Sequence, residues 1–133
     1  RRKYNKDYLK FDENEKINFL KLKLNSPKNI INKFQFKNKE NKEVWETFNV
    51  LSQEPAECLG AYVISMTSSA SDILSVSFLQ KEAKIKNKLR VVPLFETLED
   101  LINAKQIIEN LFSQKWYRKL INYKQEVMIG YSD

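Results

Sequence analysis

The chain has 133 residues, 42% of them hydrophobic, which is enough for one domain, or part of one, with a real core. It has no histidine and one cysteine, Cys58. This composition excludes a histidine-based triad, a histidine metal ligand or an internal disulfide within these residues, and it favours a reducing cytoplasmic location. The sequence contains no run of about 18 apolar residues that would predict a membrane span, and its charged start does not resemble a secretory signal.

The net charge of +6 is concentrated in the N-terminal third of the chain. Residues 1–45 hold 13 Lys and Arg against 6 Asp and Glu, whereas the remainder holds 10 against 11. The lysines are mixed with Asn and Ile and do not cluster with the Arg, aromatic and glycine residues of common nucleic-acid modules. We interpret them as a solvated surface and expect no nucleic-acid or membrane partner. The alternative is a non-catalytic basic module or remnant that binds a polyanion through residues 1–45.

Two helices are predicted in the first half of the chain. The first begins at a capping-box pattern in residues 12–15 and ends at residues 25–27, where Pro27 stops it. The second covers residues 43–54, and residues 28–42 between them are expected to be irregular. The side chains expected to face inward from these two helices are Ile17, Leu20, Leu24, Val44, Phe48 and Leu51.

Strands and helices are predicted to alternate from residue 61 onward. Residues 61–66, 89–95 and 126–131 are short apolar runs typical of strands, and the first run suggests burial on both faces. Residues 67–72 supply caps for a helix that runs through about residue 83. A second helix is predicted at residues 98–111, capped by Thr97 and with Leu98, Leu101, Ile108 and Leu111 on its apolar side. A shorter helix is predicted at residues 116–124.

This alternation predicts an α/β fold with a parallel sheet. Three strands leave two long apolar edges unpaired, so we expect further chain to close the sheet. The chain is therefore divided into a helical, Lys/Asn-rich part, residues 1–56, and a βαβαβ segment, residues 57–133.

Two acids follow predicted strands and are candidate metal ligands. Glu96 and Asp133 each come directly after the carboxyl end of a strand, where the side chains of parallel strands converge. Hard divalent cations bind such carboxylates. The alternative is that Glu96 is a loop acid near a helix N-terminus and Asp133 a helix cap.

Several other polar and aromatic residues have structural interpretations. Arg90 and Arg118 have side chains suited to a phosphate or carboxylate, but Arg90 begins a strand at the end away from the expected site. The larger aromatic residues are interpreted as core or core-edge residues: Trp45, Tyr62, Trp116 and Tyr117.

Several motifs, in order and spacing, resemble phosphoenolpyruvate carboxylase. They are Gly-Ala-Tyr-Val-Ile-Ser-Met at residues 60–66, Val-Pro-Leu-Phe-Glu-Thr-Leu-Glu-Asp-Leu at 92–101, Trp-Tyr-Arg at 116–118 and Val-Met-Ile-Gly-Tyr-Ser-Asp at 127–133. The resemblance is strong from about residue 57 onward and weaker upstream, where Leu-Asn-Ser-Pro at 24–27 matches. It implies an eight-stranded β/α (TIM-like) barrel with additional helices, to which this segment contributes three strands and their crossovers.

The resemblance also implies a function and a set of site residues. The family is a cytoplasmic lyase, expected to be a homo-tetramer, that converts phosphoenolpyruvate and bicarbonate to oxaloacetate and phosphate with Mg²⁺ or Mn²⁺. Its motifs imply that Glu96 and Asp133 ligate the metal and that Leu94 and Met128 lie near the substrate methylene; core packing explains the last two equally well. The family's phosphate-binding arginines and catalytic histidines lie outside these residues. We therefore expect the isolated segment to be inactive and to bind metal weakly at best.

Overall fold

The structure is a computed structural model that describes residues 8, 10–28, 39–55, 60–65, 67–86 and 88–130. The chain forms two compact units, one within residues 1–59 and 74–88 and the other within residues 60–73 and 89–133. Helix α4 (Ala70–Glu82) contributes its first turn to the second unit and its remainder to the first. Among the described residues, no helix has the length and apolar character needed to cross a membrane.

The first unit contains α2 (Glu13–Asn25), which begins where the capping pattern predicts. The Asp12 carboxylate caps it by accepting a 2.8 Å hydrogen bond from the Glu15 backbone N–H. Ile17 and Leu20 are buried, as expected from their spacing. At the other end, the Lys81 ammonium donates to the carbonyl oxygens of Lys23 and Lys28, which satisfies part of the helix terminus.

Helix α3 (Lys39–Gln53) differs from the prediction in its start and in one inward residue. It begins four residues before the expected start at residue 43, so residues 39–42 are helical rather than irregular. Its first turn is made of polar residues and has no apolar periodicity, which is why the pattern did not mark it. Phe48 is buried as expected, but Val44 is 44% exposed, so its inward assignment was wrong.

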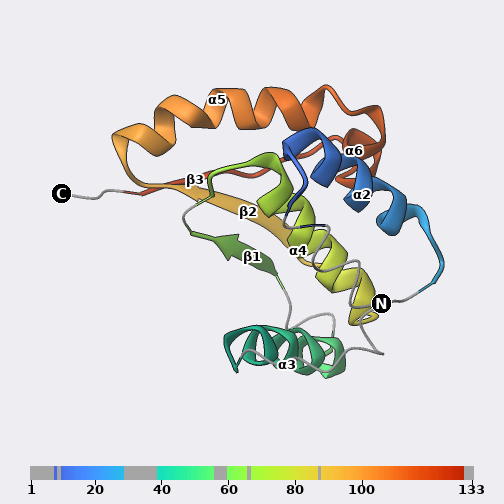
Figure 1. The fold of residues 1–133 in the computed structure, drawn as a ribbon. Helices are drawn as coiled ribbons and strands as arrows, with labels where there is room; N and C mark the ends of the chain where they lie inside the picture. The colour runs from blue at the N-terminus through green and yellow to red at the C-terminus, as the bar shows by residue number, and fades with distance from the viewer. Residues whose placement is uncertain are drawn as a thin grey trace. The chain divides into compact units, whose positions relative to one another are not determined.

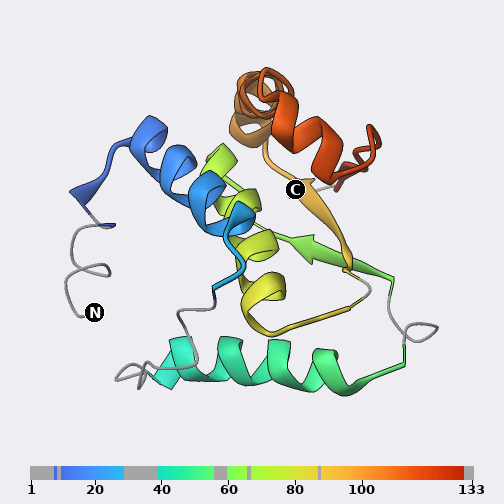
Figure 2. The same ribbon diagram turned by 90° about the vertical axis from the view of Figure 1, so that its right-hand side faces the viewer.

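The second unit is built on the parallel sheet that the sequence predicts. Strands β1 (Ala61–Ile64), β2 (Arg90–Phe95) and β3 (Met128–Ile129) lie in the order β1-β2-β3, with β2 paired in parallel to both neighbours (Figure 1). Helix α5 (Leu98–Phe112) follows β2 and packs against the short helix α6 (Lys115–Leu120), from which the chain returns to β3 (Figure 2). The buried apolar residues from β2, α5 and α6 are Val92, Pro93, Phe95, Ile107, Leu111 and Tyr117.

The last two predicted elements are shorter than expected. Helix α6 ends at Leu120 instead of residue 124, because Asn122 and Tyr123 have positive φ angles of 52° and 59°, which do not continue a right-handed helix. Strand β3 has two residues rather than six, although residue 131 of the predicted strand lies outside the described residues.

Two burial expectations in the second unit were wrong. Strand β1 is not buried on both faces, since Val63 is 41% exposed. On α5, Leu98 is 76% exposed and Leu101 is also exposed, while Ile107 and Leu111 are buried. The exposed apolar side chains at these positions mark surfaces that the described residues do not cover. The expected boundary between residues 56 and 57 lies outside the described residues.

Candidate metal site

The turns after β1 and β2 are held in the same way. After β1, the Asp72 carboxylate accepts hydrogen bonds from the backbone N–H groups of Ser68 and Ser69, at 3.1 and 3.2 Å. After β2, the Asp100 carboxylate accepts from those of Glu96 and Thr97, at 3.3 and 3.2 Å. In each case an acid in the first helical turn fixes the backbone that leaves the carboxyl end of a strand.

The turn after β2 completes a capping box for α5. Thr97 is the N-cap, as predicted, and its hydroxyl accepts a 3.1 Å hydrogen bond from the Asp100 N–H. The hydrogen bonds from the Thr97 and Glu96 backbone hold the pKa of Asp100 below its ordinary value. Capping is therefore done by Thr97 and Asp100. The Glu96 side chain is exposed and its carboxylate accepts no hydrogen bond from the residues that the structure describes.

Glu96 lies beside the end of β3. The Gly130 N–H donates a 3.0 Å hydrogen bond to the Phe95 carbonyl oxygen, which continues the β2–β3 pairing past β3 itself. A Cβ atom at Gly130 would lie 3.0 Å from Glu96 Cγ and 3.5 Å from Leu94 Cδ1. The side chains of Glu96 and Leu94 therefore extend along the sheet face on which a side chain at position 130 would stand.

The predicted substrate-pocket residues lie on that same face. Leu94 of β2 is the register partner of Met128 of β3. Because alternate residues of a strand point to the same side, Leu94 and Glu96 share a face, as do Met128 and Gly130. Leu94 is half-buried and Met128 is 45% exposed. The structure thus brings three of the four predicted site residues together, with one carboxylate next to two apolar side chains.

Asp133, the fourth predicted site residue, lies outside the described residues, three positions after Gly130. Within the described ranges, no group of three or more His, Cys, Asp or Glu side chains is arranged to hold a metal ion. The exposed Glu96 carboxylate is an oxygen donor of the type that Mg²⁺ and Mn²⁺ prefer, so the residues present fit one part of such a site.

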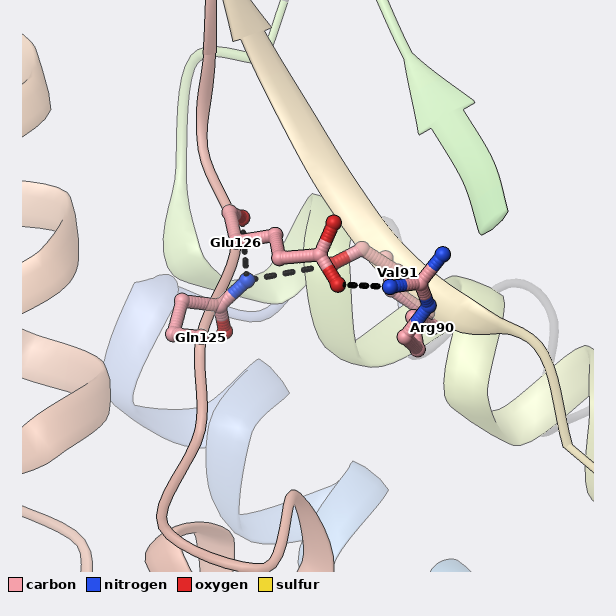
Figure 3. Close-up of polar contacts among 4 residues, drawn as sticks. All are labelled: Arg90, Val91, Gln125 and Glu126. Carbon is pink, nitrogen blue, oxygen red and sulfur yellow. Dashed lines mark hydrogen bonds and ion pairs between the residues drawn. The ribbon is translucent and has the colours of Figure 1, made fainter. Parts of the chain in front are cut away.

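Sequence reasoning missed the contacts that hold the opposite end of β3 (Figure 3). The Gln125 amide donates hydrogen bonds to the carbonyl oxygens of Val91, at 3.0 Å, and Glu126, at 2.8 Å. The Arg90 guanidinium forms an ion pair with the Glu126 carboxylate. Opposite charges at the first residue of β2 and two residues before β3 were a signal for this pair, whereas a single Gln in a polar stretch offers no signal.

The Gln125 side chain is also joined to α6. The Tyr117 hydroxyl donates a hydrogen bond to Gln125 Oε1. Tyr117 is buried, as its interpretation as a core residue requires, and burial raises the pKa of its hydroxyl to about 12. Trp116 is half-buried against it, with ring centroids 6.2 Å apart, and Arg118 is exposed.

Three parallel strands joined by helices, with an exposed acid after the carboxyl end of β2, define an α/β segment with an open sheet. Comparison with known proteins assigns the family. The sequence model of phosphoenolpyruvate carboxylase matches residues 2–133, and the chain belongs to this lyase family.

Individual relatives cover nearly the whole chain. Phosphoenolpyruvate carboxylase 1 of Flaveria trinervia is 47% identical over 126 residues, which are 95% of this chain and 13% of that protein. The enzyme of Marinomonas sp. is 48% identical over 127 residues, 96% of this chain and 14% of the relative. Phosphoenolpyruvate carboxylase 3 of Arabidopsis thaliana is 56% identical over 97 residues, 73% of this chain and 10% of the relative. The chain thus spans about one-seventh or less of the relatives' length.

Proposed function

We propose that these residues form part of the catalytic β/α barrel of a complete phosphoenolpyruvate carboxylase, where Glu96 and Asp133 ligate a divalent metal ion. The observation that carries the metal assignment is the packing of Glu96 against Gly130, at the end of the neighbouring strand and three residues before Asp133. The capping box also supports it, because Thr97 and Asp100 cap α5 and the Glu96 carboxylate remains at the surface.

The proposed reaction converts phosphoenolpyruvate and bicarbonate to oxaloacetate and phosphate. Mg²⁺ or Mn²⁺, when bound, would hold substrate oxygens and stabilise the enolate that forms as the phosphoryl group leaves. Glu96 and Asp133 would supply two anionic oxygens to the ion and leave its other positions for substrate and water. Leu94 and Met128 would present an apolar wall to the substrate methylene and keep water from the enolate.

Exposed apolar surface supports the barrel context. Val63 on β1 and Met128 on β3 are both more than two-fifths exposed, and each belongs to a strand with one unpaired edge among the described residues. Further barrel strands would pair with these edges and cover these side chains. The three-stranded sheet shown here would then be one arc of the closed barrel.

The proposal extends to the behaviour of the isolated segment and of the parent enzyme. We expect the 133 residues alone to have no carboxylase activity, because two ligands without a closed barrel are poorly positioned. The cytoplasmic location and homo-tetrameric state of the parent remain predictions. The polyanion-binding alternative also remains a prediction, since only part of residues 1–45 is described, and no observed contact favours it.

A segment exchange tests this function. These residues replace the matching segment of the Flaveria trinervia enzyme, and oxaloacetate formation is followed through its reduction by malate dehydrogenase. We expect the exchanged enzyme to be active and Glu96→Gln or Asp133→Asn to lower kcat/KM by roughly 100-fold or more, the scale on which electrostatic transition-state stabilisation acts. Glu99→Gln, which changes an exposed acid in the first turn of α5, three residues after Glu96, is the matched control. Full activity in both site variants would contradict the proposal.

A further inference from the structure

We propose that Gly130 is a positioning residue for Glu96: its missing side chain leaves the space in which the Glu96 methylenes lie. This inference rests on the proposed metal function. It concerns the orientation of the Glu96 carboxylate toward the ion and adds no further ligand.

The need for glycine at position 130 is one of space rather than of backbone conformation. Neither described glycine has a positive φ angle, so an L-amino acid can adopt the backbone of Gly130 without strain. What a side chain would meet is Glu96, with Cγ at 3.0 Å and Cδ at 3.7 Å from the Cβ position. Carbon atoms in favourable contact are about 3.5–4.0 Å apart, so the contact with Cγ is tight and the Glu96 side chain would have to shift by a few tenths of an ångström. The 3.5 Å contact with Leu94 Cδ1 is an ordinary one.

The Glu96 side chain is the group that would move. The backbone of Gly130 is held by its 3.0 Å hydrogen bond to Phe95 and by the adjacent β2–β3 register. The backbone of Glu96 is held by the Asp100 carboxylate. The Glu96 side chain is exposed, and its rotamer can change at small cost. An added methyl group should therefore redirect the carboxylate and leave the sheet intact.

Gly60 provides a matched control within the same unit. A Cβ atom at Gly60 would meet no heavy atom within 4 Å. Both glycines adjoin strands of the sheet, Gly60 just before β1 and Gly130 just after β3. Alanine at the two positions thus adds the same group, and only at position 130 does that group meet a proposed ligand.

The test is a titration of a complete carboxylase carrying this segment with Mn²⁺, the free ion being measured by electron paramagnetic resonance. We expect Gly130→Ala to weaken Mn²⁺ binding roughly 10-fold or more, the scale on which a disturbed ligand environment acts, and Gly60→Ala to leave it unchanged. The same Gly130→Ala change in a Glu96→Gln background should not weaken Mn²⁺ binding further, because the ligand that it displaces is already lost.

Each outcome decides the inference. Unchanged Mn²⁺ affinity in Gly130→Ala, or equal losses in the wild-type and Glu96→Gln backgrounds, would overturn it while leaving the metal assignment of Glu96 in place. Unchanged affinity in Glu96→Gln would overturn the metal assignment and this inference together. If Gly130→Ala fails to fold, the double variant with Glu96→Ala should fold as well as Glu96→Ala alone, since the contact is gone; failure of that rescue would also refute the inference.

Discussion

The Gln125 side-chain amide donates a 3.0 Å hydrogen bond to the carbonyl oxygen of Val91. The same side chain accepts from the Tyr117 hydroxyl, so one residue links the segment before β3 to both β2 and α6. Among the described residues, β3 pairs with β2 at two register positions, and one further backbone hydrogen bond joins Gly130 to Phe95. Side-chain hydrogen bonds therefore hold the segment between α6 and β3, which leads to the proposed site.

Replacement of Gln125 by Leu should destabilise the fold. The change leaves the Val91 carbonyl without this donor and the buried Tyr117 hydroxyl without this acceptor, and unsatisfied buried polar groups cost about 1–3 kcal/mol each. Urea unfolding of the 133-residue chain, followed by tryptophan fluorescence, measures the loss. Gln125→Glu keeps an acceptor for Tyr117 and should lose less. An unfolding midpoint unaffected by Gln125→Leu would show that these contacts do not hold β3.

The Arg90–Glu126 ion pair should contribute little. Its side chains are 63% and 50% exposed, and exposed pairs are worth roughly 0–1 kcal/mol. We expect Glu126→Gln to lower the free energy of unfolding by less than Gln125→Leu does. The loss should shrink near 1 M salt, where the Debye length is about 3 Å. Glu109→Gln, which removes the exposed Lys105–Glu109 pair, is the reference. A large, salt-independent loss of stability in Glu126→Gln would contradict this ranking.

Stability should fall at high pH because of Tyr117. Burial raises the pKa of its hydroxyl to about 12 in the folded chain, against about 10 when unfolded. Below the unfolded pKa, both states are protonated and no stability is lost. Between about pH 10 and 12 the unfolded state releases the proton first, which weakens folding by up to ~1.4 kcal/mol per pH unit. Comparing the unfolding of wild type and Tyr117→Phe at pH 8–11 isolates the contribution of Tyr117 to the pH dependence of stability. Parallel stability profiles for the two proteins would contradict this prediction.

The capping box of α5 should matter for both stability and the position of Glu96. Thr97→Ala removes the N-cap acceptor, a change that typically costs ~1 kcal/mol. Asp100 has a pKa below its ordinary value in the folded chain, so its stabilising effect is present above the unfolded pKa and is lost as pH falls through the folded pKa. Unfolding between pH 2 and 6 should therefore show a steeper acid loss in wild type than in Asp100→Asn. Glu99→Gln serves as the control, and an acid profile unchanged by Asp100→Asn would refute the assignment.

The order of strands and helices was predictable because it rests on strong local patterns. The apolar runs at residues 61–66 and 89–95 mark β1 and β2, and Thr97 marks the start of α5; the structure confirms all three. The boundary errors arose where local pattern is weak. The polar first turn of α3 has no apolar period, and the left-handed residues after α6 include a tyrosine, which rarely adopts that conformation.

The predicted site was only partly accessible from sequence. The ends of the predicted strands pointed to Glu96, and the family resemblance pointed to Leu94 and Met128. In the structure Leu94 and Met128 are register partners, and Glu96 follows the last residue of β2. The close approach of Gly130 to Glu96 could not be predicted, because it depends on the stagger between two strands. The exposure of Val63 and Leu98 was missed because an apolar pattern predicts burial and an exposed apolar side chain leaves no mark in the sequence.

The most direct test of the metal assignment is a crystal structure of the complete carboxylase grown with Mn²⁺, with anomalous diffraction recorded at the manganese edge. We predict one anomalous peak at the carboxyl end of β2, bonded to an oxygen of Glu96 and an oxygen of Asp133 at about 2.1 Å, the distance typical of small octahedral divalent ions. A fully occupied manganese peak elsewhere in the barrel, with both carboxylates outside bonding distance, would contradict the account.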